Sequence, residues 1–144
     1  MSVPEGDWIR GISIRQPWTT AILTGAKTIE NRPQHWSWRS WVLLHAGLEI
    51  DRPALRLPLV GRTVRGRELV TGAVIGVARL TDCHQDPDGS PPCTEWAQPD
   101  AWHLVLADVQ ELALPVPVRG QLGPWKPTLD LLFQVLQQLP DLRP

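Results

Sequence analysis

The chain has 144 residues, of which 42% are hydrophobic and 20% charged, and its formal net charge is -1. This size favours a single domain over residues 1–144, and because no run of about 18 apolar residues occurs, the sequence predicts no membrane-spanning helix. Two cysteines are too few for a disulfide framework, and the first residues, MSVPEGD, lack the basic start and apolar stretch of a secretion signal. We therefore expect a cytoplasmic protein with reduced thiols.

Charge is distributed unevenly along the chain. Residues 1–81 contain 11 Lys+Arg against 6 Asp+Glu, whereas residues 82–144 contain 3 against 9. A basic segment without an acid contains Arg52, Arg56, Arg62, Arg65 and Arg67. This segment favours a polyanionic partner on one face of the molecule, and a solvated arginine-rich surface is the alternative.

The N-terminal part predicts strand, helix and strand in that order. A β-favouring run over 9–14 is followed by Pro17, which suits the first position of a short helix. Gly25 ends that helix, because a left-handed C-cap costs glycine little. Residues 28–32 then have the pattern of a strand, with Lys27 at its entrance.

The middle of the chain predicts two more strands and a long loop. Residues 41–47 are a buried strand ended by a glycine, and residues 51–59 suggest a short helix or turn. A strand follows over 72–80, whose paired glycines indicate a bend or a close backbone approach. The Asp-, Pro- and Gly-rich stretch 82–100 predicts an exposed loop.

The C-terminal part predicts a strand over 103–109, an extended segment over 115–120 and a final amphipathic helix over about 128–139, capped by Thr128. The expected apolar face of this helix, which should pack on the core, contains Leu129, Leu132, Phe133, Leu136 and Leu139. Several short strands and few helices favour an α+β fold that is mainly β, a small barrel with a short helix beside it.

A motif with functional chemistry follows the first helix. Lys27, Glu30 and Arg32 bring an amine, a carboxylate and a guanidinium within six positions, and Lys27 is one of only two lysines in the chain. Strand alternation places Glu30 and Arg32 on one side, where the flexible lysine can reach them. The alternatives are an ordinary exposed ion pair for Lys27 and simple neutralisation of Glu30 by Arg32.

Tryptophan dominates the aromatic residues, with eight Trp, one Phe and no Tyr. Most indoles should fill the core, but Trp36, Trp38 and Trp41, interleaved with Arg39 beside the motif, are the ones we expect to be partly exposed. Exposed indoles can stack on nucleobases.

Five fragments, in this order along the chain, resemble the ASCH domains of the PUA-like superfamily. They are Ser13-Ile14-Arg15-Gln16-Pro17-Trp18, Gly25-Ala26-Lys27 to Glu30-Asn31-Arg32, Leu44-His45-Ala46-Gly47, Gly72-Ala73-Val74-Ile75-Gly76, and Leu104-Val105-Leu106-Ala107-Asp108 with Gly120 to Trp125. The resemblance implies a PUA-like β-barrel with a cleft beside the first helix, lined by Lys27, Glu30 and Arg32.

The same resemblance implies RNA, another single-stranded nucleic acid or a modified nucleoside as partner. Arg32 and Lys27 would meet a phosphate or carbonyl oxygen, and Glu30 would accept from an exocyclic amine. The other expected ligand contacts are Arg15, Trp18, Trp36, Trp38, Arg39 and His45, although His45 also fits a core position. The sequence indicates no membrane contact and no obligate protein partner.

A small subgroup of ASCH domains resembles amidohydrolases that act on acetylated cytidine, with a Lys, a Thr and a Glu in the site. This chain departs from that pattern, since Glu30 occupies the position of the hydroxyl residue and Thr28 directly follows Lys27. Neighbouring strand residues face opposite sides, which makes Thr28 a poor nucleophile for Lys27. Hydrolysis of an amide or of RNA by Lys27 and Glu30 is the alternative to binding alone.

A metal site on residues 82–103 is a third possibility. Cys83, His84, Cys93 and His103 are thiol and imidazole groups, but their spacing differs from that of paired-ligand zinc sites. The sequence interpretation therefore assigns no metal and no cofactor.

Overall fold

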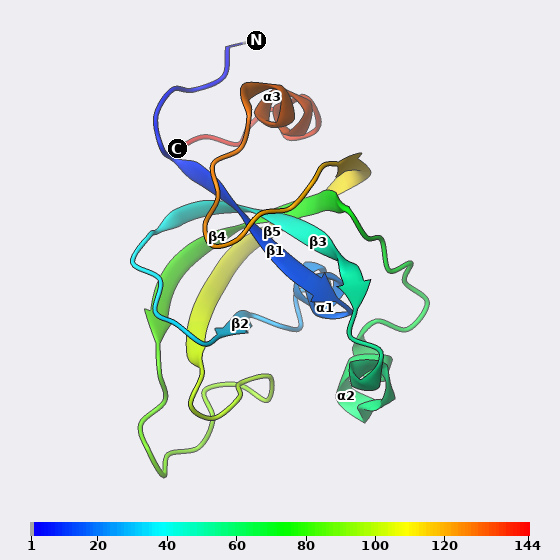
Figure 1. Ribbon diagram of the computed structural model, residues 1–144, viewed down its shortest axis with the longest axis vertical. Helices are drawn as coiled ribbons and strands as arrows, with labels where there is room; N and C mark the ends of the chain where they lie inside the picture. Colours follow the sequence, from blue (N-terminus) through cyan, green and yellow to red (C-terminus); the bar gives the residue numbers. More distant parts are fainter. Residues whose placement is uncertain (1) are drawn as a thin grey trace.

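A computed structural model describes residues 2–144 (Figure 1). The elements are, in chain order, β1 (Ile9–Gln16), α1 (Trp18–Leu23), β2 (Ile29–Arg32), β3 (Ser40–Ile50), the 3-10 helix η1 (Pro53–Arg56), α2 (Pro58–Thr63), β4 (Ala73–His84), β5 (Trp102–Pro117) and α3 (Leu129–Gln138). Within residues 2–144, no helix combines the length and apolar character needed to cross a membrane.

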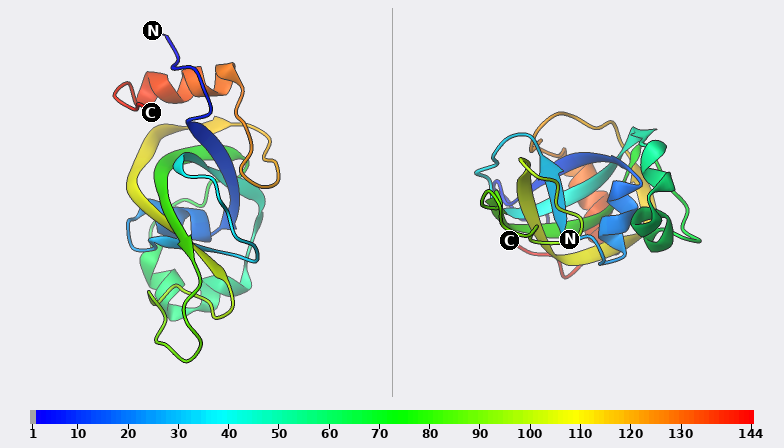
Figure 2. Two further views of the ribbon diagram at one scale, coloured as in Figure 1. Left: turned by 90° about the vertical axis from the view of Figure 1, so that its left-hand side faces the viewer. Right: turned by 90° about the horizontal axis from the view of Figure 1, so that it is seen from below.

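The five strands form one mixed sheet in the order β1-β3-β4-β5-β2. β1 runs parallel to β3, and the other neighbouring strands are antiparallel. The sheet curls into a barrel-like form, and its edge strands β1 and β2 are not paired with each other (Figure 2). This arrangement confirms the predicted α+β, mainly β fold.

Two glycines act as the sequence predicts. Gly25, after α1, has a φ of +85°, which turns the chain toward β2. Gly76 lies at a register irregularity between β4 and β5, and a Cβ there would come within 2.7 Å of the Gln110 carbonyl oxygen. The strand can therefore bend only because no side chain is present at position 76.

Helix α3 lies across the end of the sheet opposite the loop of residues 85–101 (Figures 1 and 2). The Thr128 side chain caps it by accepting from the Leu131 backbone N–H at 3.2 Å. Its buried residues are Leu131, Leu132, Val135 and Leu136. The expected apolar face was partly wrong, since Leu129 is 74% and Phe133 40% exposed.

Several strand boundaries also differ from the prediction. β3 continues past Gly47, β4 extends to His84, and β5 includes the extended segment at its end, because cross-strand hydrogen bonds continue through residues whose local pattern indicates a loop. The loop that follows β4 is not uniformly exposed. Its Trp96 is buried against Ala21 and Ile29, which covers one side of the region between α1 and β2.

Candidate functional site

A cavity of about 320 Å³ lies between the edge strands β1 and β2, beside α1. Polar and charged side chains make up most of its wall. Its lining residues are Ser13, Ile14, Arg15, Trp18, Lys27, Glu30, Asn31, Arg32, Pro33, Asp51 and Gln98. The unpaired edges of the sheet thus leave a polar opening in the barrel wall.

Lys27, Glu30 and Arg32 form a connected ion network in this cavity. Lys27 is only 1% exposed, and its Nζ donates to Glu30 Oε1 at 2.8 Å and to the Ile29 carbonyl at 2.7 Å. The other carboxylate oxygen, Oε2, lies 3.4 Å from Arg32 Nη2. The predicted convergence is present, and the buried lysine differs from the exposed ion pair considered as the alternative. One carboxylate between two cations leaves the network with a net positive charge.

Arg32 also spans the gap between the two sheet edges. Its Nη2 donates to the Ser13 carbonyl of β1 at 2.8 Å. Within residues 2–144, four buried side-chain atoms lack a hydrogen-bond partner, and two of these, Arg32 Nε and Ser13 Oγ, belong to residues of the cavity wall. Buried polar atoms normally have partners, so an acceptor oxygen in the cavity would satisfy the Arg32 donor.

Trp18 forms an aromatic part of the wall. It is half-buried, its Nε1 donates to Asp51 Oδ2 at 3.1 Å, and its ring meets Trp96 edge to face. Lys27 Nζ lies 5.7 Å from the Trp18 ring centroid, a cation–π distance. Arg15, at the mouth, is exposed and therefore free to reorient toward an anion.

Asn31 and Gln98 are wall residues that sequence reasoning missed. Asn31 Nδ2 donates to the Trp96 carbonyl at 2.9 Å, and its Oδ1 accepts from the Gln98 backbone N–H at 2.9 Å. These bonds fasten the loop of residues 85–101 to β2. Asn31 was inside the recognised motif, but no local signal pointed to Gln98, because its position depends on how the loop folds back.

Of the expected contact residues, four lie outside the cavity wall, namely Trp36, Trp38, Arg39 and His45. Trp36 stacks on Arg32 from the other side, with the guanidinium carbon 5.6 Å from the ring centroid, and Trp38 packs against Arg10. Arg39 donates to the Trp36 and Trp38 carbonyls and so orders its own loop. Trp36 and Trp38 are partly exposed as predicted, but Trp41 was wrongly placed with them, since it is buried and donates to the Arg143 carbonyl.

His45 lies in an adjacent groove rather than in the cavity. This groove shares Ser13 and Arg15 with the cavity. His45 is 2% exposed, and its ring Nε2–H donates to the Val118 carbonyl at 2.8 Å. Burial lowers the pKa of His45, although the Val118 hydrogen bond acts in the opposite direction. The neutral ring is therefore the form that the fold favours.

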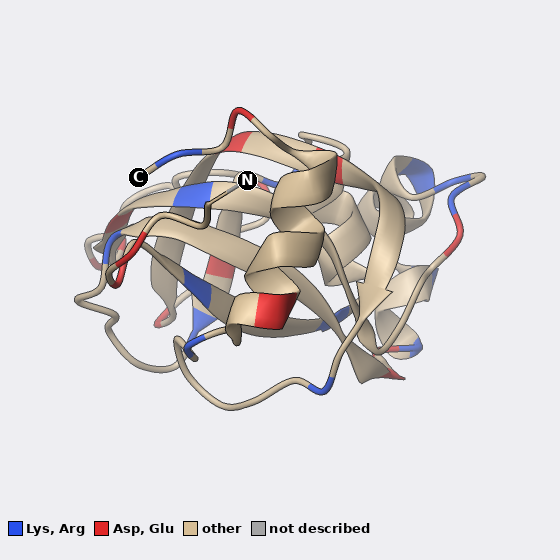
Figure 3. Cartoon of the chain, turned by 90° about the horizontal axis from the view of Figure 1, so that it is seen from above, with Lys and Arg blue, Asp and Glu red and all other residues tan. Residues whose placement is uncertain are grey.

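Positive charge continues next to the cavity. The arginines of the basic segment follow Asp51 directly and are exposed on and around η1 and α2. Figure 3 shows several basic residues, with acidic residues among them, on the side of the molecule that contains α2, whereas α3 carries a single acidic residue. Arg67 is paired with Glu111 at 2.9 Å, which removes it from the set available to a polyanion.

Comparison with known proteins gives one distant similarity. No family model matches the chain. It is 23% identical over 136 residues to Activating signal cointegrator 1 of Homo sapiens, an alignment that covers 85% of this chain and 22% of the human protein. The chain therefore corresponds to about a fifth of the length of this relative, to which it is distantly similar over most of its own length.

Proposed function

We propose that residues 1–144 form one ASCH-type domain of the PUA-like superfamily, with α3 packed on it, that binds RNA or a modified nucleobase or nucleotide between β1 and β2. The observation that carries the proposal is the cavity wall itself. It contains a cationic network around Glu30 and a buried donor without a partner, Arg32 Nε.

The wall offers each contact that an unpaired base requires. Glu30 accepts from an exocyclic amine, Arg32 Nε donates to a carbonyl or phosphate oxygen, and the half-buried Trp18 ring flanks the base. Arg15 at the mouth meets the phosphate. A volume of about 320 Å³ lies at the small end of ligand sites, which suits one nucleoside rather than a duplex.

Similarity to the human relative supports the family assignment only in part, because the identity is 23% and the alignment covers a fifth of that protein. The five fragments that resemble ASCH domains contain most of the wall residues, including Arg15, Trp18 and the Lys27–Arg32 motif. Resemblance and geometry therefore support the same cavity.

Binding is tested with the full chain and two matched arginine variants. Short single-stranded RNA, cytidine and acetylated cytidine are titrated while tryptophan fluorescence is followed at two salt concentrations. Arg15→Ala removes a cation from the cavity mouth and is expected to weaken binding about tenfold, the usual effect of losing one charged hydrogen bond. Arg62→Ala removes an exposed cation outside the cavity and should weaken RNA binding much less. Equal losses would indicate non-specific attraction of RNA and contradict the proposal.

Hydrolysis is the second candidate, because Lys27 Nζ and the Glu30 carboxylate are hydrogen-bonded to each other within the cavity wall. Thr28 is exposed and outside that wall, so a water molecule would have to be the nucleophile. Chromatography of the same mixtures tests this candidate. Product formed by the wild type and lost in Glu30→Gln would replace binding alone with hydrolysis of an amide or of RNA.

A further inference from the structure

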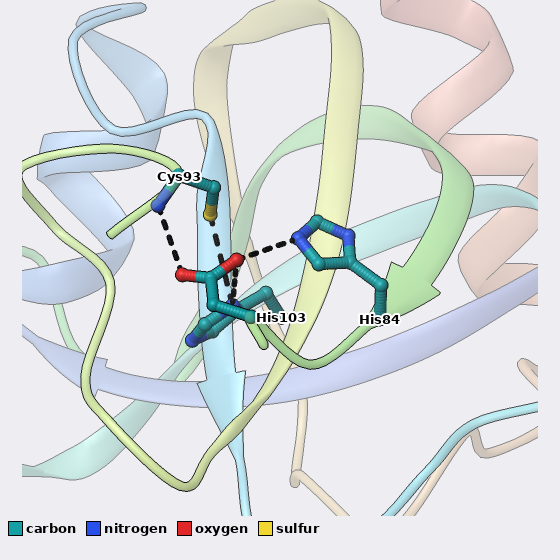
Figure 4. A group of neighbouring side chains, drawn as sticks. His84, Cys93 and His103 are labelled. Carbon is teal, nitrogen blue, oxygen red and sulfur yellow. Dashed lines mark hydrogen bonds and ion pairs between the residues drawn. The ribbon is translucent and has the colours of Figure 1, made fainter. Parts of the chain in front are cut away.

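Four side chains with metal-binding atoms converge where β4 ends and β5 begins (Figure 4). His84, the last residue of β4, is paired in the antiparallel register with His103 of β5. Directly opposite residues project to the same face of a sheet, so this register brings the two imidazole rings together, with centroids 5.4 Å apart. The following loop then returns Asp86 and Cys93 to the histidines.

The residues of this cluster differ in one position from the four that the sequence suggests as metal ligands. Cys83 is buried among the aliphatic residues of the sheet interior and takes no part, while Asp86 occupies the fourth position. Cys93 is exposed as a residue, yet its sulfur faces His103 (Figure 4).

Three of the six distances between the ligand atoms match a tetrahedral site, and all four atoms lie within 4.8 Å of one another. Cys93 Sγ lies 3.6 Å from His103 Nδ1, and Asp86 Oδ1 lies 3.2 Å from His84 Nε2 and 3.5 Å from His103 Nδ1. Around zinc, with bonds of about 2.0 Å to nitrogen or oxygen and about 2.3 Å to sulfur, tetrahedral edges measure about 3.6 Å for S–N and about 3.3 Å for N–O. These three edges already fit one ion, and any longer separation within the 4.8 Å cluster would have to shorten for all four atoms to bind it.

Both histidines are oriented by partners on their far sides. His103 is fully buried, and its Nε2–H donates to the Gln98 carbonyl at 2.9 Å, which leaves the Nδ1 lone pair directed at the cluster. His84 Nδ1 faces Asp82 Oδ2 at 3.6 Å. Metal-binding histidines typically donate their second N–H to a carbonyl or carboxylate. His103 has this arrangement, and the Asp82 carboxylate is the nearest such partner for His84, just beyond hydrogen-bond distance.

Without a cation, exchangeable protons hold the ligand atoms together: His84 Nε2–H can donate to Asp86 Oδ1 at 3.2 Å, and the Cys93 thiol can donate to His103 Nδ1 at 3.6 Å. Asp86 Oδ2 already accepts from the Cys93 backbone N–H at 2.9 Å, which leaves Oδ1 directed at the cluster. Asp86 Oδ1 and His103 Nδ1 face each other at 3.5 Å, and the one N–H of a neutral His103 is committed elsewhere. A metal ion would take the place of these shared protons and bind all four atoms at once.

We propose that His84 Nε2, Asp86 Oδ1, Cys93 Sγ and His103 Nδ1 bind one zinc ion. Two imidazoles, a thiolate and a carboxylate favour zinc over the oxygen-seeking Mg²⁺ and Ca²⁺. Four protein ligands close the tetrahedron, which makes the site structural rather than catalytic. Four coordinate bonds form on binding, the thiol proton passes to solvent, and no group is oxidised or reduced.

The zinc ion would hold one wall of the candidate cavity in place. Gln98, whose carbonyl orients His103, also lines the cavity and donates its backbone N–H to Asn31. Trp96, two residues earlier, accepts from Asn31 as well. The loop is therefore attached at its base by the metal ligands and near its end by β2, independently of what the cavity binds.

Metal content and Co²⁺ spectroscopy of the purified full chain test this proposal. We expect one zinc per chain, and after exchange one equivalent of Co²⁺ with tetrahedral bands and a thiolate charge-transfer band. Cys93→Ser should remove that band and weaken zinc binding about 100-fold or more. Cys83→Ala, which removes the other thiol, should retain the charge-transfer band and the zinc affinity of the wild type. Asp82→Ala, behind His84, should weaken zinc binding about 10- to 100-fold.

His84→Ala keeps the test decisive if Cys93→Ser fails to fold, because the His84 side chain is 35% exposed and its loss leaves no large cavity. It should also bind zinc about 100-fold more weakly. Absence of stoichiometric zinc uptake by reduced wild type, an octahedral spectrum without a thiolate band, or unchanged affinity in both Cys93→Ser and His84→Ala would overturn the proposal.

Discussion

The cavity between β1 and β2 and the cluster at the end of β4 gather polar side chains in different ways. In the cavity, Lys27, Glu30 and Arg32 belong to one strand and its entrance, and their charges largely satisfy one another. In the cluster, residues as distant as His84 and His103 meet through strand register and a returning loop, and exchangeable protons link their nitrogen, oxygen and sulfur atoms. A site whose charges are already paired selects ligands by its shape and remaining donors, whereas a cluster of metal-binding atoms that share only exchangeable protons favours a cation.

Loss of the Lys27 ammonium should produce the largest change in stability. Lys27→Met leaves Glu30 with Arg32 alone, at 3.4 Å, and deprives the Ile29 carbonyl of its donor. Removing one partner of a buried ion pair costs about 3–5 kcal/mol, so we expect the free energy of unfolding to fall by this amount. Urea denaturation followed by tryptophan fluorescence measures it.

The control for this change is Arg67→Met, because the Arg67–Glu111 pair is much more exposed than the pair in the cavity. Exposed pairs contribute about 0–1 kcal/mol, and the control should lose no more than that. Similar losses of unfolding free energy in the two variants would show that the buried Lys27–Glu30 pair contributes no more to stability than the exposed Arg67–Glu111 pair. Adding Glu30→Gln to Lys27→Met should restore part of the stability, since the uncompensated carboxylate is then gone.

Removal of zinc should have the next largest effect, and it should be confined mainly to one end of the molecule. At a free zinc concentration 100 times the dissociation constant, binding stabilises the fold by about 2.7 kcal/mol. With a chelator, amide hydrogen exchange should accelerate in the loop of residues 85–101. Amides of α3, at the opposite end, should retain most of their protection (Figure 1). Equal exchange in the loop with and without zinc would contradict the structural role of the ion.

Sequence reasoning predicted the cavity better than the cluster, for a physical reason. Alternation along a strand places Glu30 and Arg32 on one side whatever the rest of the fold does, and Lys27 reaches them over a short distance. The register that pairs His84 with His103 depends on where two long strands begin and bend, and local pattern does not specify it. Asp86 was therefore missed, and Cys83, adjacent to His84, was included although it faces the core.

The tryptophans show the same limit. Trp36 and Trp41 lie five positions apart in similar sequence contexts. Only Trp41 contacts the C-terminal part of the chain, where its Nε1 donates to the Arg143 carbonyl. Likewise, the position of α3 and its Thr128 cap were predicted correctly, but its buried face was predicted only in part, because that face depends on where the helix crosses the sheet. Local chemistry thus predicts which elements form, and contacts between distant segments determine which side of each becomes buried.

Asn31→Ala should detach the loop of residues 85–101 from β2. It removes the hydrogen bonds to the Trp96 carbonyl and from the Gln98 N–H, for an expected loss of about 1–3 kcal/mol in unfolding free energy. Zinc affinity should also fall a few-fold, because the loop that presents Cys93 is less ordered. Gln134→Ala, which breaks an exposed bond to Asp130 on α3, is the matched control and should change neither quantity appreciably.

His45 should give the smallest effect, a pH dependence of stability. Burial lowers the pKa of His45 in the fold, whereas the unfolded chain takes up the proton near its ordinary pKa of about 6.5. The unfolded state therefore binds more protons between these two values, and stability should fall as the pH drops below about 6.5, by at most about 1.4 kcal/mol per pH unit. In the chelator-treated protein, His45→Gln can still donate to the Val118 carbonyl but cannot titrate, so its stability should decline less between pH 7 and pH 5. If the stability of the wild type and of His45→Gln depended on pH with the same slope, the pKa of His45 would be the same in the folded and unfolded states. The His45 ring would then be protonated in the fold at low pH instead of staying neutral.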